Sequence, residues 1–355
     1  MRWNKRLGAV LICASASAFI GLASVQAYES QNSFVYKKKY VMGTIFEIAT
    51  YAETPAQGSN GIDQAFREIV RLDDLMSDYK DESALSRLNR SVHLQPESVP
   101  DDLYRVIDES LYYSRLSDGK FDITVRPLVN LWKAANRGGR APSLIDQEKL
   151  RACVGYQTVE LLPPNRIKLR SSCVQIDLGA IGKGYALDRA AVVLRSCGIS
   201  RALLNAGGST ILAMGAPPGQ AAWPVDLRDP SNSLHPQVRL RDNSISTSEQ
   251  TPPSLLSKEV TGHIIDPANG LPLKTDFAVS VIAKTATASD ALSTTLLLLG
   301  PEKGQELVKI VPDMAAIWIS ADGRSEMASS GPQILLPNAH QGLTRSFTAR
   351  PNDIH

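Results

Sequence analysis

Apolar residues recur at every third or fourth position in several stretches of the chain, the spacing of helices that bury one face. The clearest examples are residues 62–76 and 285–299. Gly300 is placed to end the second of these helices, because glycine readily adopts the left-handed backbone that closes a helix. Further helices are predicted at 83–89, at 101–118 with Asp101 as N-cap, at 186–197 followed by Gly198, and at 302–311.

Shorter apolar segments with a β-type pattern predict strands between these helices. They lie at residues 36–50, 174–178, 202–206, 223–227, 238–240, 244–248, 278–283 and 315–320. Gly43 interrupts the first segment, which indicates a bulge or a close approach of the backbone to something else. Helices and strands mix without a regular β-α-β alternation. The pattern therefore predicts an α+β fold with mixed, largely antiparallel sheets and flanking helices.

Two stretches in the middle of the chain have a weaker pattern. Residues 120–128 alternate polar and apolar side chains, which suits a half-buried strand or a turn that faces a cleft, and a surface hairpin fits the local pattern better. Residues 133–145 are rich in Gly, Arg and Pro and are predicted to form a mobile loop.

The first 27 residues have the composition of a Sec-type signal peptide. Arg2, Lys5 and Arg6 precede an apolar run over residues 7–25, and small residues at 25–27 suit cleavage. A retained membrane anchor is the alternative, whereas Cys13 lies inside the apolar run and does not indicate a lipoprotein. We expect a periplasmic protein with one catalytic domain over residues 28–336 and a disordered tail over residues 337–355.

Charge and cysteine content narrow the range of partners. Removing the three positive charges of the leader takes the formal net charge from +2 to −1, so nucleic acid is not an expected partner. In an oxidising compartment Cys153 and Cys173 can form a bridge around a segment that looks like a β-hairpin. Cys197 is predicted to be a buried, inert thiol, and the absence of a Cys/His cluster leaves a zinc site without support.

A glycine-rich turn follows residues 174–178. Gly179, Gly182 and Gly184 lie between this predicted strand and the helix at 186–197, with the spacing G-x-x-G-x-G. Backbone N–H groups at such a helix start can bind anions, phosphates above all. The spacing matches neither the Rossmann fingerprint nor the Walker A loop, and a simple tight turn is the alternative.

Two oxygen-bearing residues share one face of the helix at 285–299. Asp290 and Thr294 are four positions apart, and their neighbours are apolar. An aspartate on a buried helix needs a partner, and a carboxylate with a hydroxyl at this spacing can hold Mg²⁺. The alternative is that Asp290 caps the helix while Thr294 hydrogen-bonds to a backbone carbonyl.

Several of these motifs occur together in an order that resembles a known family. They are Met42-Gly43-Thr44, Asp122, the glycine turn, His263-Ile264-Ile265-Asp266-Pro267 and Ser289-Asp290-Ala291-Leu292-Ser293-Thr294. Between about Val41 and Trp318 the chain resembles the FAD:protein FMN transferases, the ApbE-like family. The resemblance implies a two-lobed single catalytic domain that cleaves FAD with Mg²⁺, attaches FMN through a phosphoester to a threonine of a target flavoprotein, and releases AMP.

The resemblance also implies a role for individual residues. His263 would accept the proton of the acceptor threonine, for which an unperturbed histidine pKa near 6.5 is suitable. The backbone carbonyl of Ala180 and the side chains of Asp290 and Thr294 would bind Mg²⁺. The residues implied to contact FAD are Met42, Tyr79, Lys120, Phe121, Asp122, Asp177, Lys183 and Ile264.

Two departures from the family pattern affect these expectations. Thr247-Ser248 is followed by Glu249-Gln250-Thr251, where the family usually has glycine and, shortly after, tyrosine; this region lies near the acceptor side. Lys120 stands where a small residue is common and could add a cation near the phosphates.

Two alternative functions stay open: an FAD pyrophosphatase that releases FMN and AMP, and a non-catalytic flavin-binding accessory protein of a redox complex. A membrane association through the target complex is also left open.

Overall fold

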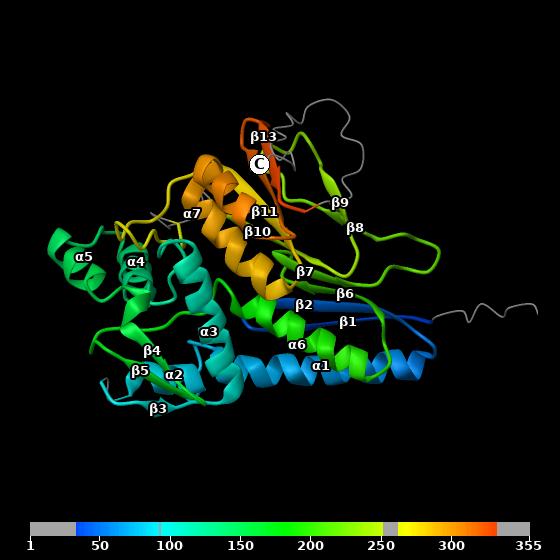
Figure 1. Ribbon diagram of the computed structural model, residues 1–355, viewed down its shortest axis with the longest axis horizontal. Coiled ribbons are helices and arrows are strands. Elements are labelled where there is room, and N and C mark those ends of the chain that lie inside the picture. The colour runs from blue at the N-terminus through cyan, green and yellow to red at the C-terminus, as the bar shows by residue number, and fades with distance from the viewer. Residues whose placement is uncertain (1–32, 92–93, 251–261, 332–355) are drawn as a thin grey trace, which may run out of the picture. The chain divides into compact units, whose positions relative to one another are not determined.

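An eight-stranded antiparallel sheet forms the centre of the fold (Figure 1). The structure is a computed structural model, and it describes residues 33–91, 94–250 and 262–331. The predicted α+β class with largely antiparallel strands is confirmed. In spatial order the strands are β1 (Ser33–Val41), β2 (Thr44–Ala52), β6 (Arg201–Ala206), β7 (Thr210–Met214), β10 (Ser244–Glu249), β11 (Phe277–Ala283), β12 (Ala315–Ser320) and β13 (Ser325–Ser329).

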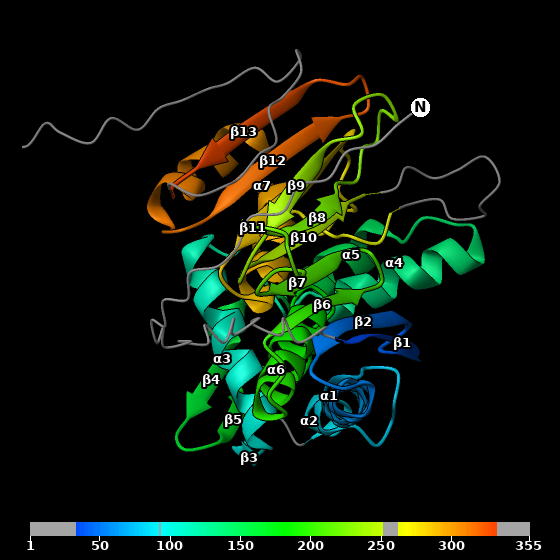
Figure 2. The same ribbon diagram turned by 90° about the vertical axis from the view of Figure 1, so that its right-hand side faces the viewer.

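The two faces of this sheet are covered by different elements. Helices α1 (Pro55–Met76), α6 (Gly182–Ser196) and α7 (Ala286–Ile310) pack against one face and enclose the larger apolar core (Figures 1 and 2). The opposite face packs against the hairpin of β8 (Trp223–Asp226) and β9 (Gln237–Leu240). Because neighbouring side chains of a strand point to opposite faces, buried β-strands such as β11 are apolar at nearly every position.

Two smaller groups of elements complete the described part of the chain. The first comprises α2 (Ala84–Arg90), α3 (Asp101–Leu116) and a three-stranded sheet in the order β3 (Glu97–Ser98), β5 (Arg166–Leu169), β4 (Val159–Leu162). The second comprises α4 (Arg126–Gly138) and α5 (Leu144–Arg151). The predicted disulfide is present: Cys153 and Cys173 are bonded, with their Cα atoms 5.4 Å apart, and close the segment that holds the β4–β5 hairpin.

The prediction of a strand at residues 174–178 is wrong. Only one isolated parallel bridge, between Val125 and Gln175, occurs there. The backbone is satisfied in another way: the Asn89 side chain accepts a hydrogen bond from the Ile176 N–H at 2.7 Å and donates one to the Ile176 carbonyl at 2.9 Å. The Asp177 N–H donates to the Ile123 carbonyl at 2.7 Å. A buried apolar segment can therefore be extended without joining a sheet, because an amide side chain and a neighbouring turn satisfy its backbone groups.

Of the alternatives for residues 120–128, the turn that faces a cleft is correct and the surface hairpin is wrong: residues 120–125 form a turn that leads into α4 and lines a cavity. The mobile loop predicted for residues 133–145 is wrong, because most of these residues belong to α4 and α5. Leu128 and Trp132, four positions apart, form the buried side of α4 and pack against Ile265. Proline at the helix start and Gly139 in the left-handed conformation, with φ of 64°, give this helix defined ends.

Three local predictions need correction. The break at Met42-Gly43 is a hairpin turn between β1 and β2, with φ values of 51° and 74°, and not a bulge. Pro100 rather than Asp101 occupies the N-cap of α3. Cys197 is half-buried at the C-cap of α6 and not fully buried. The predicted break at Gly300 is present inside α7, where φ is 74°.

The predicted leader over residues 1–27, the domain boundary at residue 336 and the tail over residues 337–355 all lie outside the described residues. Among the described helices, none is both long enough and apolar enough to cross a membrane.

Candidate active site

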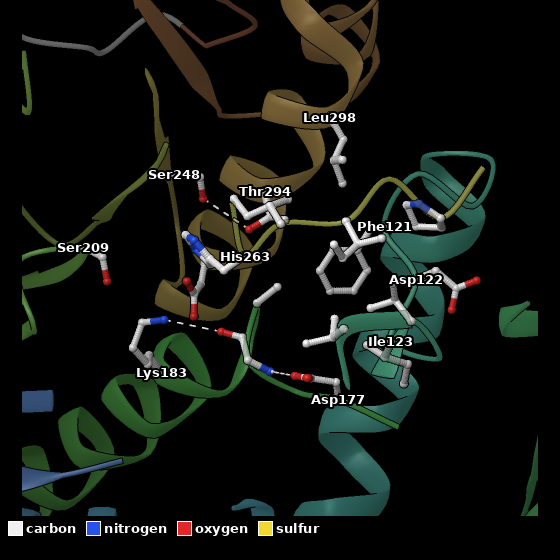
Figure 3. Close-up of a pocket in the computed structure, with 18 of the residues that line it drawn as sticks. Phe121, Asp122, Ile123, Asp177, Lys183, Ser209, Ser248, His263, Thr294 and Leu298 are labelled. Carbon is white, nitrogen blue, oxygen red and sulfur yellow. Dashed lines mark hydrogen bonds between the residues drawn. The ribbon is translucent and has the colours of Figure 1, made fainter. Parts of the chain in front are cut away.

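A cavity of about 520 Å³ lies where α7, the glycine turn, residues 120–125 and the segment around His263 meet (Figure 3). Its size lies within the usual range of small-molecule sites. With the exception of Met42, every predicted site residue lines it. These residues are Tyr79, Lys120, Phe121, Asp122, Asp177, Ala180, Lys183, His263, Ile264, Asp290 and Thr294. The fold thus gathers residues that lie more than 200 positions apart in the sequence.

Met42 lines a second hollow, of about 1100 Å³, directly beside the first. The two hollows share Tyr79, Asp177, Lys183 and His263. The β1–β2 hairpin turn carries Met42 to the edge of the glycine turn, where its Cε would lie 3.7 Å from a Cβ at Gly182. Met42 therefore belongs to the rim of the same site.

The third glycine of the turn allows two helices to approach closely. A Cβ at Gly184 would lie 2.2 Å from the carbonyl oxygen of Ala286 and 2.8 Å from the Cβ of Asp290, so no larger residue fits between α6 and α7. The N–H of Gly184 donates a hydrogen bond to Asp290 Oδ2 at 2.9 Å. The glycine turn thus orients the Asp290 carboxylate as well as starting α6.

Asp290 is only 4% exposed and is held by neutral groups. Its Oδ1 accepts hydrogen bonds from the hydroxyls of Thr210, at 3.2 Å, and Ser246, at 3.4 Å. Nearby on the same helix, the Thr294 hydroxyl lies 3.2 Å from that of Ser248. These contacts form a cluster of oxygen atoms at one wall of the cavity.

The structure excludes the alternative interpretation of these two residues. Thr285 is the N-cap of α7, and Asp188 from α6 binds the N–H groups of Ala286 and Thr287 at 2.9 and 2.8 Å. Asp290 therefore does not cap the helix. Thr295, not Thr294, donates to a helix carbonyl, that of Ala291. Both oxygen groups of Asp290 and Thr294 are directed away from their own backbone.

The donor set at this wall fits Mg²⁺. Among the ion pairs of the described residues, none includes Asp290, so its buried carboxylate is not neutralised by a protein cation. The atoms around it are hydroxyl oxygens, and the peptide carbonyl of Ala180 lines the same cavity. Hard oxygen ligands with a single carboxylate suit Mg²⁺, which usually retains waters or substrate phosphates in its other positions. Within residues 33–91, 94–250 and 262–331, no cluster of three or more His, Cys, Asp or Glu side chains could hold a softer metal.

His263 lies close to this oxygen cluster. Figure 3 shows it between Lys183, Ser248 and Thr294, on the side of the cavity opposite Phe121. The segment that carries it continues into a turn in which Asp266 Oδ1 accepts a hydrogen bond from the Ala268 N–H at 3.0 Å. This position would suit a proton acceptor next to a group bound at the oxygen cluster.

The expected extra positive charge at Lys120 is neutralised. Its ammonium group lies 3.0 and 2.9 Å from the two carboxylate oxygens of Asp266. Both side chains are largely buried, with 26% and 13% of their side-chain surface exposed. Lys120 therefore joins the turn at residues 120–125 to the turn that follows His263, and contributes little net charge to the cavity.

Asp122 and Asp177 have raised pKa values for the same main reason. Burial raises the pKa of Asp122, although hydrogen bonds from Thr124 and from the Tyr156 N–H partly offset the effect. Burial raises the pKa of Asp177, and the negative charge of Asp78 adds to this increase. The carboxylate of Asp122 points away from the cavity in Figure 3, so its segment lines the site mainly through Phe121 and Ile123.

Some cavity residues were not predicted from the sequence. Among them are the polar residues Asp78, Lys133, Ser209 and Arg228 and the apolar residues Ile123, Val129 and Leu298. Lys133 Nζ donates to the Tyr79 hydroxyl at 3.0 Å and lies 5.3 Å from the centre of its ring. Its position on α4 was missed because this helix was interpreted as a loop. Asp78 forms an ion pair with Arg126. Of these residues, it could have been found from the sequence, because it directly precedes the predicted site residue Tyr79.

Glu249, which departs from the expected family pattern, lies at the edge of the cavity. Its carboxylate is 2.9 Å from the Arg228 guanidinium, and the two side chains are 19% and 63% exposed. Both residues also line a separate hollow of about 500 Å³ outside the cavity. The negative charge that replaces the usual glycine is therefore paired within this chain.

The fold and the site place the chain in the class of flavin transferases. It is similar to the flavin transferase ApbE from Vibrio cholerae, with a TM-score of 0.75 and 26% identity, over 84% of this chain and 98% of that one. It is also similar to the flavinyl transferase ApbE of Pseudomonas stutzeri in its apo form, with a TM-score of 0.75 and 27% identity, over 84% of this chain and 96% of that one.

Sequence comparison identifies the family. A profile of the ApbE family matches residues 42–318. The FAD:protein FMN transferase of Escherichia coli (strain K12) is 32% identical over 271 residues, which cover 74% of this chain and 77% of that protein. The FAD:protein FMN transferase of Treponema pallidum (strain Nichols) is 29% identical over 92% of this chain and 93% of that protein. The chain belongs to the ApbE family.

Proposed function

We propose that this protein is an FAD:protein FMN transferase that uses Mg²⁺ to transfer FMN from FAD to a threonine hydroxyl of a target protein, with release of AMP. One observation carries the proposal. Asp290, Thr294 and His263 come from distant segments and lie with Lys183 around one end of a cavity whose other end is apolar. The first end suits a pyrophosphate, and the second, with Phe121, Ile123 and Leu298, suits a flavin ring.

The residues of the chain have separate tasks in this reaction. Asp290, Thr294 and the Ala180 carbonyl would hold Mg²⁺, which neutralises phosphate charge and polarises the bond that breaks. Lys183 adds a positive charge near the phosphates, and Tyr79 with Lys133 covers the outer part of the cavity. His263 accepts the threonine proton while the threonine oxygen bonds to the FMN phosphorus and AMP departs with the electrons of the cleaved P–O bond.

We further propose that the protein acts after export. The leader-like residues 1–27 and the Cys153–Cys173 bridge support an oxidising compartment such as the periplasm. The target would then be an exported flavoprotein, and any membrane association would come from that target.

One assay tests the proposal. Purified protein is incubated with FAD, Mg²⁺ and a peptide that contains an acceptor threonine, and products are followed by mass spectrometry. A peptide heavier by the mass of FMN, together with one AMP per peptide, is the expected result. Free FMN and AMP without modified peptide would replace the proposal by FAD hydrolysis, and bound but unchanged FAD would replace it by a non-catalytic flavin-binding function. Omission of Mg²⁺ is the control.

A further inference from the structure

The side chain of Gln250 connects the end of β10 to the segment that carries His263. It is only 7% exposed, and its amide is fully used. Nε2 donates to the carbonyls of Ile264, at 3.0 Å, and Leu273, at 3.1 Å. Oε1 accepts from the N–H of Ile264 at 3.2 Å. One buried amide thus makes three hydrogen bonds, two of which are to the residue directly after His263.

The glycine before His263 makes room for this amide. A Cβ at Gly262 would lie 2.1 Å from both Cδ and Nε2 of Gln250, closer than any side chain could be accommodated. Within the same segment the Leu273 N–H donates to the Ile264 carbonyl, Ile265 forms an isolated bridge with Pro272, and Lys120 binds Asp266. Gln250 therefore ties a short, two-stranded turn to the main sheet.

This connection links the histidine to the oxygen cluster. Ser248 on β10, two residues before Gln250, lies 3.2 Å from the Thr294 hydroxyl and 2.8 Å from that of Ser293. A path of direct contacts thus runs from α7 through β10 and the Gln250 amide to the backbone beside His263. The His263 side chain itself is exposed.

We propose that Gln250 is a positioning residue that holds His263 in register with Asp290 and Thr294. The inference rests on the proposed function, in which His263 accepts the threonine proton. A general base must lie within hydrogen-bonding distance of that proton, and displacements of about 1 Å can cost on the order of 10²-fold in rate. The Gln250 amide sets this distance because it fixes the backbone one residue away from the histidine.

The test is a double-mutant cycle between Gln250→Met and His263→Ala. Methionine keeps the length of the side chain and removes the amide. We expect Gln250→Met to lower kcat for transfer by about 10-fold, with the KM and Kd for FAD unchanged. When His263 is already alanine, the same substitution is expected to have no further effect, because its effect acts through the histidine.

Two more variants separate positioning from general damage to the fold. Gly262→Ala leaves Gln250 in place but pushes its amide aside, and is expected to reproduce the loss in kcat. Gln57→Met is the matched control: this amide donates to the Cys197 carbonyl at 3.1 Å, far from the cavity, and its loss is expected to leave transfer unchanged. If Gln250→Met does not fold, Gln250→Asn and Gly262→Ala carry the same cycle.

The outcomes are distinct. Equal losses from Gln250→Met in the presence and absence of the histidine, or a wild-type kcat in both Gln250→Met and Gly262→Ala, would overturn the inference. Failure of the proposed function has another signature, namely no transfer by the wild-type protein or full activity of His263→Ala. FAD binding, followed by flavin fluorescence, shows in each variant that the cavity is intact.

Discussion

Two walls of the cavity each carry a buried aspartate, but the two carboxylates are held by different donors. On the structural wall, formed by Phe121, Asp122 and Ile123, Asp122 accepts from the Thr124 N–H and hydroxyl at 2.8 and 2.6 Å and from the Tyr156 N–H at 2.8 Å. The Thr124 hydroxyl itself accepts from the Gly155 N–H at 2.7 Å, so its proton is directed at Asp122.

The reactive wall, formed by Ser248, His263, Asp290 and Thr294, has donors that can turn. Oδ1 of Asp290 is met by two hydroxyls at 3.2 and 3.4 Å, and these lie 3.0 Å from each other, so either can be the donor. Its Oδ2 accepts from the fixed Gly184 N–H. Hydroxyl groups rotate at little cost and can also accept, whereas backbone N–H groups cannot. A carboxylate oxygen met by hydroxyls can bind a cation without leaving buried donors unsatisfied. Both aspartates are buried, so burial does not distinguish them. The kind of hydrogen-bond donor that each carboxylate meets distinguishes the ligand-binding aspartate from the structural one.

The comparison predicts its largest effect at Asp290. Asp290→Ala is expected to reduce Mg²⁺-dependent transfer by at least ~10³-fold, because it removes the only carboxylate proposed to bind the metal. Thr294→Ala should cost less, since a water molecule can replace a neutral oxygen. Transfer rates measured over a Mg²⁺ titration check both. Equal activity of Asp290→Ala and wild type at limiting Mg²⁺ would remove Asp290 from the reactive wall.

The next effect is expected at His263. His263→Ala should slow transfer by ~10²–10⁴-fold while FAD binding is kept, as expected for the loss of a positioned general base. Single-turnover transfer rates and FAD titrations measure the two properties separately. Unimpaired transfer at pH 7 would mean that the histidine is structural and that the reactive wall consists of oxygen ligands alone.

The order of the two aspartates is expected to reverse when stability is measured: substitution of Asp122 should lower the free energy of unfolding more than substitution of Asp290. Asp122→Asn places an NH₂ group against a fixed N–H or O–H donor and should lower the free energy of unfolding by about 1–3 kcal/mol. Asp290→Asn should cost less, since rotating hydroxyls can accept from the new NH₂ group. Denaturant unfolding of both variants provides the measurement. A larger loss for Asp290→Asn would contradict the distinction between fixed and rotating donors.

A third aspartate, Asp177, gives a pH-dependent test. Its pKa is raised by burial and by Asp78, so the ionised form reduces stability at neutral pH, and stability is gained as the pH falls from the folded-state pKa toward the unfolded one. Asp177→Asn should therefore raise the Tm at pH 7, and the difference should disappear below about pH 4. The Gly179 N–H, which donates to Oδ1 at 2.7 Å, keeps its acceptor.

Asp229 is the control, because its pKa is lowered and not raised. Desolvation by burial raises the pKa, but hydrogen bonds from the Ser231 hydroxyl and the N–H groups of Leu234 and His235 outweigh it and lower the pKa to about 2. Its contribution to stability is present above the unfolded pKa and is lost as the pH falls through about 2. Asp229→Asn should therefore lower the Tm at pH 7. A lower Tm at pH 7 in both variants would show that the charge at Asp177 does not reduce the stability of the fold.

The smallest effect is expected at the edge of the reactive wall. Glu249→Gly would free the Arg228 guanidinium and remove a negative charge, and should raise transfer to an acidic acceptor peptide several-fold at low ionic strength. Exposed charges interact by about 1 kcal/mol or less, so added salt should remove the gain. Arg228→Gln is the matched variant and should have the opposite effect. An unchanged rate at every salt concentration would place both residues away from the acceptor path.

Much of the site could be predicted because its residues lie in motifs with a clear local pattern. The i, i+4 spacing of Asp290 and Thr294 needs only helix geometry, and the structure places both oxygens at the cavity. Lys133 could not be found in this way, because it begins the stretch over residues 133–145 whose Gly, Arg and Pro content favours a loop. The hydrogen bond from the Tyr156 N–H to Asp122 depends on a contact across the fold that no local pattern contains.

The same limit explains the errors in the fold. Residues 174–178 have a strand pattern, yet the backbone of Ile176 bonds to the side chain of Asn89, 87 positions away, and the Asp177 N–H donates to the Ile123 carbonyl. Residues 133–145 contain helix-breaking residues, yet Leu128 and Trp132 bury one side of α4 against Ile265. In both places a tertiary contact decides between local structures of similar propensity.

The order in which the cavity residues occur along the chain has a consequence for folding. The lining begins at Asp78 and ends with Thr294 and Leu298 on α7, and the rim includes Met42. The sheet can begin to form from the local β1–β2 hairpin, but the oxygen cluster stays incomplete until α7 has folded against β10. A chain cut before α7 therefore lacks this wall of the cavity, even where its N-terminal elements fold.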